Sequence, residues 1–194
     1  MQINKLKRLY ISKHLSAGAI AKIYNCSENK VNYWLRKHDI KKRTISEAVY
    51  VKHNPHGDPF HILYPSKLND AILYGIGLGL YWGEGTKSNK YAIRLGNTNP
   101  EIISKFIEFL IKIYGINTSK LRFGLQVFSD VSPKAALKYW SDELGMPTSQ
   151  FYKVVVTPTR GEGTYRNKLK YGVLTVYFHN KKLRDALCQA LENL

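Results

Sequence analysis

Apolar residues recur at helical spacing through the first 45 residues. Three such patterns occur there, and Ser16 and Ser27 stand directly before the second and third, where a helix N-cap is expected. The positions that these patterns place in a core are Leu6, Leu9, Tyr10, Ile11, Leu15, Ala17, Ile20, Ala21, Tyr24, Val31, Trp34 and Leu35. We therefore predict a three-helix module over residues 1–45.

After residue 85 the pattern alternates between the helical period and the two-residue period of a half-buried strand. The expected helices lie at 99–114, 132–144 and 181–194, and the expected strands at 91–95, 121–128, 151–157 and 170–179. We expect the last two strands to form a hairpin. The fold class is then α+β, with helices covering one face of an antiparallel sheet and the other face open to a ligand.

Residues 46–66 separate these two regions and are predicted to be a linker, which leaves 67–194 as the second domain. The linker contains His53, His56 and His61 within H-N-P-H-G-D-P-F-H. Their spacing matches no familiar set of metal ligands, and two prolines and a glycine favour an irregular segment. We interpret these histidines as linker residues rather than as a metal site.

The stretch from Ala71 to Gly85 is an apolar helix with Gly75, Gly79 and Gly83 four residues apart. Each glycine costs roughly 1 kcal/mol relative to alanine in a helix interior, so a stripe of three favours close approach of a second backbone. Glu84 follows the stripe, and a second copy of the helix would place another carboxylate beside it. Two carboxylates at one place suggest a divalent metal. A buried core helix is the alternative, and the run is too short for a membrane span.

The net charge of the chain indicates the kind of partner that it binds. The chain has 30 Lys+Arg against 14 Asp+Glu, a formal net charge of +16, and 11 of the basic residues but only two acidic ones lie in the first 45 positions. Such an excess favours a polyanion through counterion release. An RNA-binding role has the same signature.

The two cysteines, Cys26 and Cys188, lie in no zinc or disulfide pattern, and the polar N-terminus resembles no signal peptide. We therefore expect an intracellular protein of the cytoplasm, the nucleoid or an organelle.

The segment from Leu15 to Ile40 resembles a helix-turn-helix domain, with Ala21 at the small position between helices and Val31 in the core. Such a domain reads the DNA major groove with the first part of its last helix. The residues on that face are Glu28, Asn29, Asn32, Tyr33, Arg36 and Lys37. A three-helix bundle that contacts another protein is the alternative.

The nine residues from Gly77 to Gly85, G-L-G-L-Y-W-G-E-G, resemble the name motif of the LAGLIDADG homing endonucleases. Gly79 and Gly83 fall on its small interface positions and Glu84 on its metal-binding acid, while Trp82 stands where the first acid would be and Gly77 replaces the leading leucine. The resemblance extends over about residues 67–194. It implies a homodimer paired through Gly75, Gly79 and Gly83, with Mg²⁺ or another divalent cation held between two Glu84 carboxylates.

The resemblance also implies that the open sheet face lies along double-stranded DNA. The candidate DNA-binding residues of this domain are Arg94, Arg122, Gln126, Lys153 and Thr175 on the strands and Arg160, Arg166, Lys168 and Lys170 in the loop before the last strand. A lysine near the metal would assist with charge, and Lys153 and Lys170 are the candidates for this catalytic role.

The sequence therefore predicts a site-specific, metal-dependent homing endonuclease that acts on double-stranded DNA as a homodimer and has no membrane partner. A relative that binds DNA as a transcription regulator without cleaving it is the first alternative. A protein that binds RNA is the second.

Overall fold

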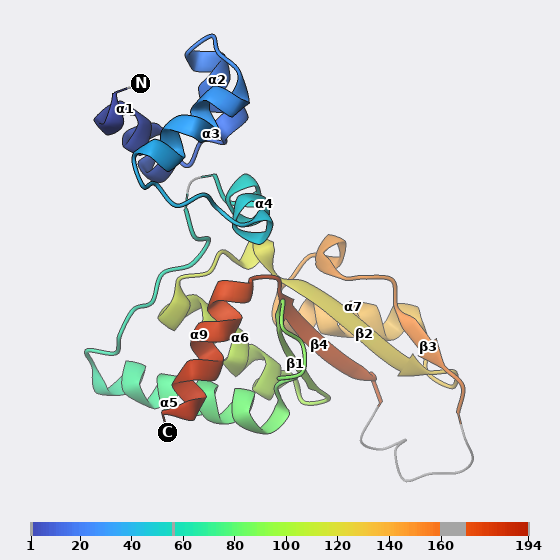
Figure 1. The fold of residues 1–194 in the computed structure, drawn as a ribbon. Helices are drawn as coiled ribbons and strands as arrows, with labels where there is room; N and C mark the ends of the chain where they lie inside the picture. The colour runs from blue at the N-terminus through green and yellow to red at the C-terminus, as the bar shows by residue number, and fades with distance from the viewer. Residues whose placement is uncertain (1, 56, 160–169, 194) are drawn as a thin grey trace. The chain divides into compact units, whose positions relative to one another are not determined.

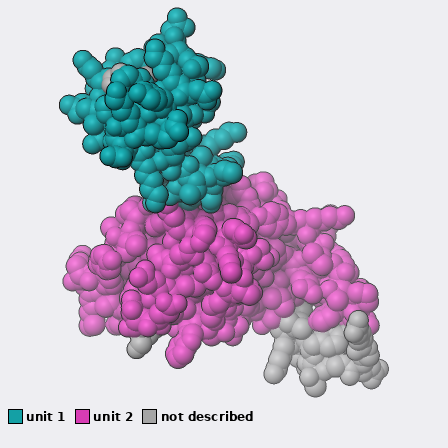
Figure 2. All heavy atoms as spheres, viewed as in Figure 1, with its two compact units in different colours: residues 1–59 teal, residues 60–194 magenta. Residues whose placement is uncertain are grey.

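The computed structural model describes residues 2–55, 57–159 and 170–193, and these form two compact units, Met1–Pro59 and Phe60–Leu194 (Figures 1 and 2). The division falls inside the segment 46–66 that the sequence marks as a linker. Arg160, Arg166 and Lys168 of the predicted DNA-binding loop lie outside the described residues.

The first unit contains helices at the three positions that the apolar pattern predicts. Its helical segments are α1 (Ile3–Lys7), which continues into the π-helical turn η1 (Arg8–Ser12), α2 (Ala17–Ile23), α3 (Glu28–Lys37) and α4 (Ile45–His53). Their core is formed by Leu6, Leu9, Tyr10, Ile20, Ala21, Val31, Leu35 and Ile40. Ile11 is exposed, so the pattern placed this residue in the core wrongly. The predicted residues Leu15, Ala17, Tyr24 and Trp34 are half-buried and pack against this core.

Caps define where these helices begin. The Ser16 side chain accepts a hydrogen bond from the Ala19 amide at 3.0 Å, and the Ser27 side chain accepts one from the Lys30 amide at 3.3 Å, as predicted. Thr44 and Glu47 form a capping box at the start of α4. This helix buries none of its residues and occupies the first part of the segment expected to be an irregular linker.

The second unit is built on a four-stranded sheet with the order β1-β4-β2-β3. The strands are β1 (Ile93–Asn97), β2 (Arg122–Phe128), β3 (Val155–Thr157) and β4 (Val173–Phe178). β4 runs antiparallel to β1 and β2, whereas β3 runs parallel to β2. The sheet is therefore mixed, and the predicted antiparallel hairpin of the last two strands is wrong.

The helix that connects β2 to β3 accounts for this difference. It is α7 (Pro133–Leu144), and it returns the chain to the end of the sheet from which β2 started, so β3 enters at the edge in the same direction. β4 then takes the central position, where Leu174, Val176 and Phe178 are buried between two neighbours.

Three further helices, α5 (Leu68–Glu84), α6 (Pro100–Tyr114) and α9 (Lys181–Glu192), pack with α7 and the sheet around one core (Figure 1). In β2 and β4, and from Ile93 to Leu95 of β1, every second residue is buried in this core, and the alternate residues are half-buried or exposed on the other face. The short edge strand β3 buries none of its residues. Asn99 and Ser132 cap α6 and α7, and Gly115 and Gly145 end them in the left-handed conformation. Among the described residues no helix has both the length and the apolar character that a bilayer crossing needs.

Candidate nucleic-acid interface

The open face of the sheet carries a row of basic and aromatic side chains across its three longest strands. Tyr177 of the central strand β4 lies opposite Arg94 of β1 and opposite Arg122 of β2. The guanidinium carbon of Arg94 lies 5.2 Å from the centre of the Tyr177 ring, a cation–π distance. Two of the DNA-binding residues expected from the sequence thus meet in one row.

Two more side chains join this row, Tyr152 beside β2 and His179 directly after β4. The ring of Tyr152 packs edge-on against Tyr177, with ring centres 5.6 Å apart, and the ring of His179 stacks on Tyr177 at 5.9 Å. The Tyr152 hydroxyl and His179 Nε2 are 2.8 Å apart, a hydrogen-bond distance. The sequence analysis missed Tyr152, Tyr177 and His179, because alternation places a residue on a face without saying which residues meet there.

The charge of this row is uncompensated in the part of the chain that the structure describes. Arg122 donates to the backbone carbonyls of Ser119 and Leu121, at 2.8 and 2.7 Å, and the described residues include no carboxylate paired with Arg94 or Arg122. The Arg94 Nε atom is buried and makes no hydrogen bond. His179 is exposed overall, but partial desolvation of its ring lowers its pKa, and the nearby charges of Arg94 and Arg122 lower it further.

The next row along the same face has little side-chain bulk. Thr175 lies there between Gly96 and Gly124. A Cβ atom added at Gly124 would lie 2.9 Å from the Tyr177 ring, and one added at Gly96 would lie 3.0 Å from Thr175 Oγ1. Because the two glycines have no side chains, this part of the sheet face is less bulky than the neighbouring basic and aromatic row. A large ligand can therefore approach the backbone closely here.

The remaining predicted residues of the second unit lie at the β3 edge and in the turn before β4. Gln126 is exposed, but its amide donates to Thr157 Oγ1 at 2.9 Å. Lys153 is exposed just before β3. Lys170 lies in the turn before β4, with its Nζ atom 5.4 Å from the Tyr171 ring centre.

Helix α5 has one open apolar face. Gly75, Gly79 and Gly83 lie on it, and a Cβ added at any of them would have no neighbouring atom within 4 Å. The large apolar side chains that flank these glycines on the helix are also exposed, and they are Leu68, Ile72, Ile76 and Trp82. The face has no partner among the described residues of its unit, so these glycines do not serve packing inside the chain.

Within the described helix α5, Gly77 is a glycine that packs against another element. A Cβ at this position would lie 2.1 Å from the Phe109 ring of α6, closer than any real contact. The two helices approach each other over this residue. In the motif resemblance Gly77 stands only as a replacement for a leucine, and the apolar pattern gives no reason to single it out.

Glu84 is the last residue of α5, and its side chain is exposed. The chain leaves the helix through Gly85, which bridges Leu95, and the Thr86 amide donates to the Arg94 carbonyl at 2.9 Å. The Glu84 backbone is therefore held at the outer edge of β1.

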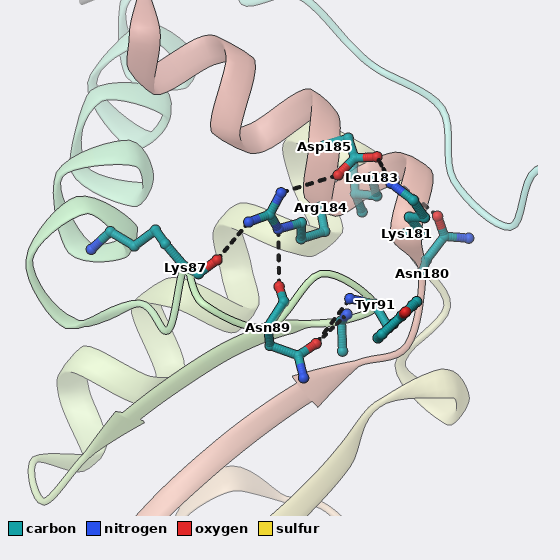
Figure 3. Close-up of polar contacts among 9 residues, drawn as sticks. Lys87, Asn89, Tyr91, Asn180, Lys181, Leu183, Arg184 and Asp185 are labelled. Carbon is teal, nitrogen blue, oxygen red and sulfur yellow. Dashed lines mark hydrogen bonds and ion pairs between the residues drawn. The ribbon is translucent and has the colours of Figure 1, made fainter.

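The loop after Glu84 is tied to α9 (Figure 3). Arg184 donates to the backbone carbonyls of Lys87 at 2.5 Å and Asn89 at 3.0 Å, and it forms an ion pair with Asp185 at 3.1 Å. The Lys87 ammonium group in turn donates to the Trp82 carbonyl at the end of α5. These contacts hold the backbone that follows Glu84 against α9 and the end of α5.

A complete metal site is not present among the residues that the structure describes, since no three His, Cys, Asp or Glu side chains come together there. Lys153 does not lie beside Glu84. The acid adjoins β1 and Lys153 precedes β3, and these strands are opposite edges of the sheet, three strand spacings or about 14 Å apart. Glu84 suits Mg²⁺ as an oxygen ligand, but one chain supplies only this one carboxylate.

The first unit exposes most of the residues expected to read bases. Asn29, Tyr33, Arg36 and Lys37 are exposed along α3, while Asn32 is half-buried. The Oδ1 atom of Asn32 is buried without a hydrogen bond. The predicted reading face is thus largely available to a ligand.

Arg43 is a residue of this unit whose part the sequence analysis missed. Its backbone amide donates to the Tyr10 hydroxyl at 2.9 Å, and its guanidinium donates to the carbonyls of Tyr10, His14 and Leu15 while lying 4.1 Å from the Tyr10 ring centre. Lys41 and Lys42, which precede it, are exposed. Arg43 therefore holds the basic segment 41–43 against the helices of the first unit.

Models of known protein families, curated proteins and solved structures were compared with this chain, and none matches it.

Proposed function

We propose that this protein binds double-stranded DNA as a homodimer and hydrolyses its phosphodiester bonds with the aid of a divalent cation such as Mg²⁺. The single observation that carries the proposal is the open face of α5. It combines three glycines without neighbours with four exposed apolar side chains, and it ends at the exposed carboxylate of Glu84.

A second copy of the same helix is the partner that suits this face. Contiguous exposed apolar surface on a helix marks a site of association. Glycines let two backbones approach closely, and a two-fold axis brings identical residues of the two copies together. A two-fold axis near the end of α5 would place the two Glu84 carboxylates side by side. One chain alone supplies only one of them.

Two such carboxylates would hold a divalent cation by oxygen atoms, and the bound cation supplies an activated water and stabilises the leaving oxygen. The protein's own residues bind and orient the DNA. On the second unit Arg94 and Arg122 of the open sheet face are the candidate contacts, and on the first unit the exposed residues of α3 are the candidates. Lys170 stays a candidate for the lysine that assists with charge, and Lys153, on the strand edge opposite to Glu84 within one chain, is a candidate for phosphate contact.

A DNA-binding regulator without cleavage is the second candidate. The observation in its favour is that the chain has Trp82 at the first acidic position of the resembled motif. Binding of RNA is the third, and the same basic surfaces would serve it.

The deciding experiment measures cleavage of duplex DNA that contains a selected binding site, with and without Mg²⁺. We expect Glu84→Gln to remove cleavage and leave DNA affinity within about twofold, because only a metal ligand is altered. Glu143→Gln, at an exposed position of α7, is the matched control and should cleave as the unmodified protein does.

Cleavage by Glu84→Gln at the original rate would eliminate Glu84 as a ligand. Tight binding of DNA by the unmodified protein without cleavage, at any concentration of Mg²⁺ or Mn²⁺, would favour the regulator. Preference for RNA over duplex DNA of the same sequence would favour the third candidate.

A further inference from the structure

We infer that His179, Tyr152, Arg94 and Arg122 form a seat for one DNA backbone phosphate, and that filling this seat is coupled to uptake of a proton by His179. The inference rests on the proposed DNA binding and adds to it a particular subsite and a dependence on pH. It does not depend on cleavage.

The seat is assembled from four parts of the second unit. Arg94 comes from β1, Arg122 from β2, His179 from the end of β4 and Tyr152 from the segment before β3. The Tyr177 ring lies at the centre, within 5.9 Å of the Arg94 guanidinium and of the Tyr152 and His179 rings. All of them belong to the open face, so a ligand can reach them from one side.

The charges favour an anion. The groups that face His179 are the guanidinium groups of Arg94 and Arg122 and the phenols of Tyr152 and Tyr177. No carboxylate of the described residues forms an ion pair with either arginine, and the buried Arg94 Nε makes no hydrogen bond. A phosphate diester supplies the missing negative charge.

The uptake of a proton follows from the protonation state of His179 before and after DNA binds. Partial desolvation and the two arginines lower the pKa of His179, so its neutral form is favoured before DNA binds. A phosphate anion in the seat opposes the effect of the arginines and raises this pKa. DNA affinity should therefore be highest at low pH and fall as pH rises through the pKa of the bound state.

The hydrogen bond between His179 and Tyr152 couples protonation of His179 to the orientation of the Tyr152 hydroxyl group. A protonated imidazole carries hydrogen on both nitrogens, so Nε2 must donate to the Tyr152 oxygen 2.8 Å away. The Tyr152 hydroxyl hydrogen is then free to be donated to a phosphate oxygen. Protonation thus adds a positive charge and also a directed donor.

The test combines an affinity measurement with a direct titration of the ring. The affinity of the full-length protein for a duplex is measured at constant salt between about pH 5.5 and 8, the range in which histidine titrates. The imidazole resonances of His179 are followed by NMR over the same range, with and without the duplex.

We expect the duplex to raise the pKa of His179 and the affinity of the unmodified protein to fall by up to about tenfold per pH unit, as uptake of one proton requires. His179→Gln should bind DNA with little dependence on pH. Tyr152→Phe keeps the ring but loses the donor, so it should show a smaller gain at low pH. His53→Gln, exposed in α4 of the other unit, is the control and should keep the original profile.

An identical pH profile in the unmodified protein and in folded His179→Gln and Tyr152→Phe, or a His179 pKa that the duplex leaves unchanged, would overturn the seat while DNA binding stands. Failure of the unmodified protein to bind a duplex at any pH would overturn the proposed function as well. The two failures are therefore distinguishable.

Discussion

At the scale of single residues, two glycines of α5 only two positions apart have opposite surroundings. Gly77 faces the Phe109 ring with no room for a Cβ atom, and Gly75 faces open space. Both cost helix stability through backbone entropy. Only Gly77 recovers that cost by packing inside its own chain.

Replacing each glycine with alanine separates these two roles. Gly77→Ala should lower the free energy of unfolding by about 1 to 3 kcal/mol, because the new methyl group displaces a packed aromatic ring. Gly75→Ala should raise the stability of the monomer by about 0.5 to 1 kcal/mol, since alanine is the better helix former and its methyl group meets nothing.

Denaturant unfolding at protein concentrations low enough for the monomer provides both values. A loss of stability in Gly75→Ala equal to that in Gly77→Ala would show that the exposed face of α5 is packed after all.

At the scale of elements, α3 is the helix to which the sequence assigns the reading of bases. Its exposed residues include Arg36 and Lys37, which are adjacent in sequence but differ in the contact expected of them. An arginine can pair with a guanine by two hydrogen bonds, whereas a lysine mostly contacts phosphate. The two side chains thus offer a test within one turn of helix.

Arg36→Ala should weaken binding to a selected site by about 1 to 3 kcal/mol and leave binding to random duplex nearly unchanged. Lys37→Ala should weaken both to a similar extent and reduce the salt dependence of binding by about one phosphate contact. Titrations of specific and random duplexes at several salt concentrations measure these effects.

Equal losses on both duplexes for Arg36→Ala would assign it to the DNA backbone. No loss for either variant would show that the first unit binds something other than DNA.

At the scale of the whole molecule, pairing of α5 with a second copy decides whether the protein can cleave DNA. The Gly79 position is open in the single chain, so a large side chain there should not disturb the monomer. In the proposed dimer the same side chain would stand between two backbones.

Gly79→Leu should therefore abolish both the dimer and cleavage while the monomer keeps its melting temperature within a few degrees. Gln189→Leu, at an exposed position of α9, adds the same surface leucine and should change neither. Sedimentation analysis with and without duplex, together with a cleavage assay, measures the outcome.

A dimer of Gly79→Leu as strong as that of the unmodified protein would place the interface elsewhere. A monomeric unmodified protein, with and without DNA, would remove the main support of the nuclease proposal.

The sequence by itself determined the local elements of this protein. Serines and asparagines before apolar runs, glycines after them and the change of period after residue 85 predict the helices and strands, because caps and periodicity act over a few neighbouring residues. The net charge of +16 and the unusual glycine stripe are likewise sequence properties. They point to polyanions and to close helix pairing before any fold is known.

Only the tertiary structure decided which residues meet. Alternation assigned Arg94 and Arg122 to a sheet face, but the central position of β4 and the parallel entry of β3 bring Tyr177, His179 and Tyr152 to them. Strand order depends on how the core is filled and on the direction in which each connecting helix returns the chain. A short apolar run contains no information about either. For the same reason the sequence could mark a stripe of glycines on α5, while the packing of α6 decided that Gly77 is the buried one.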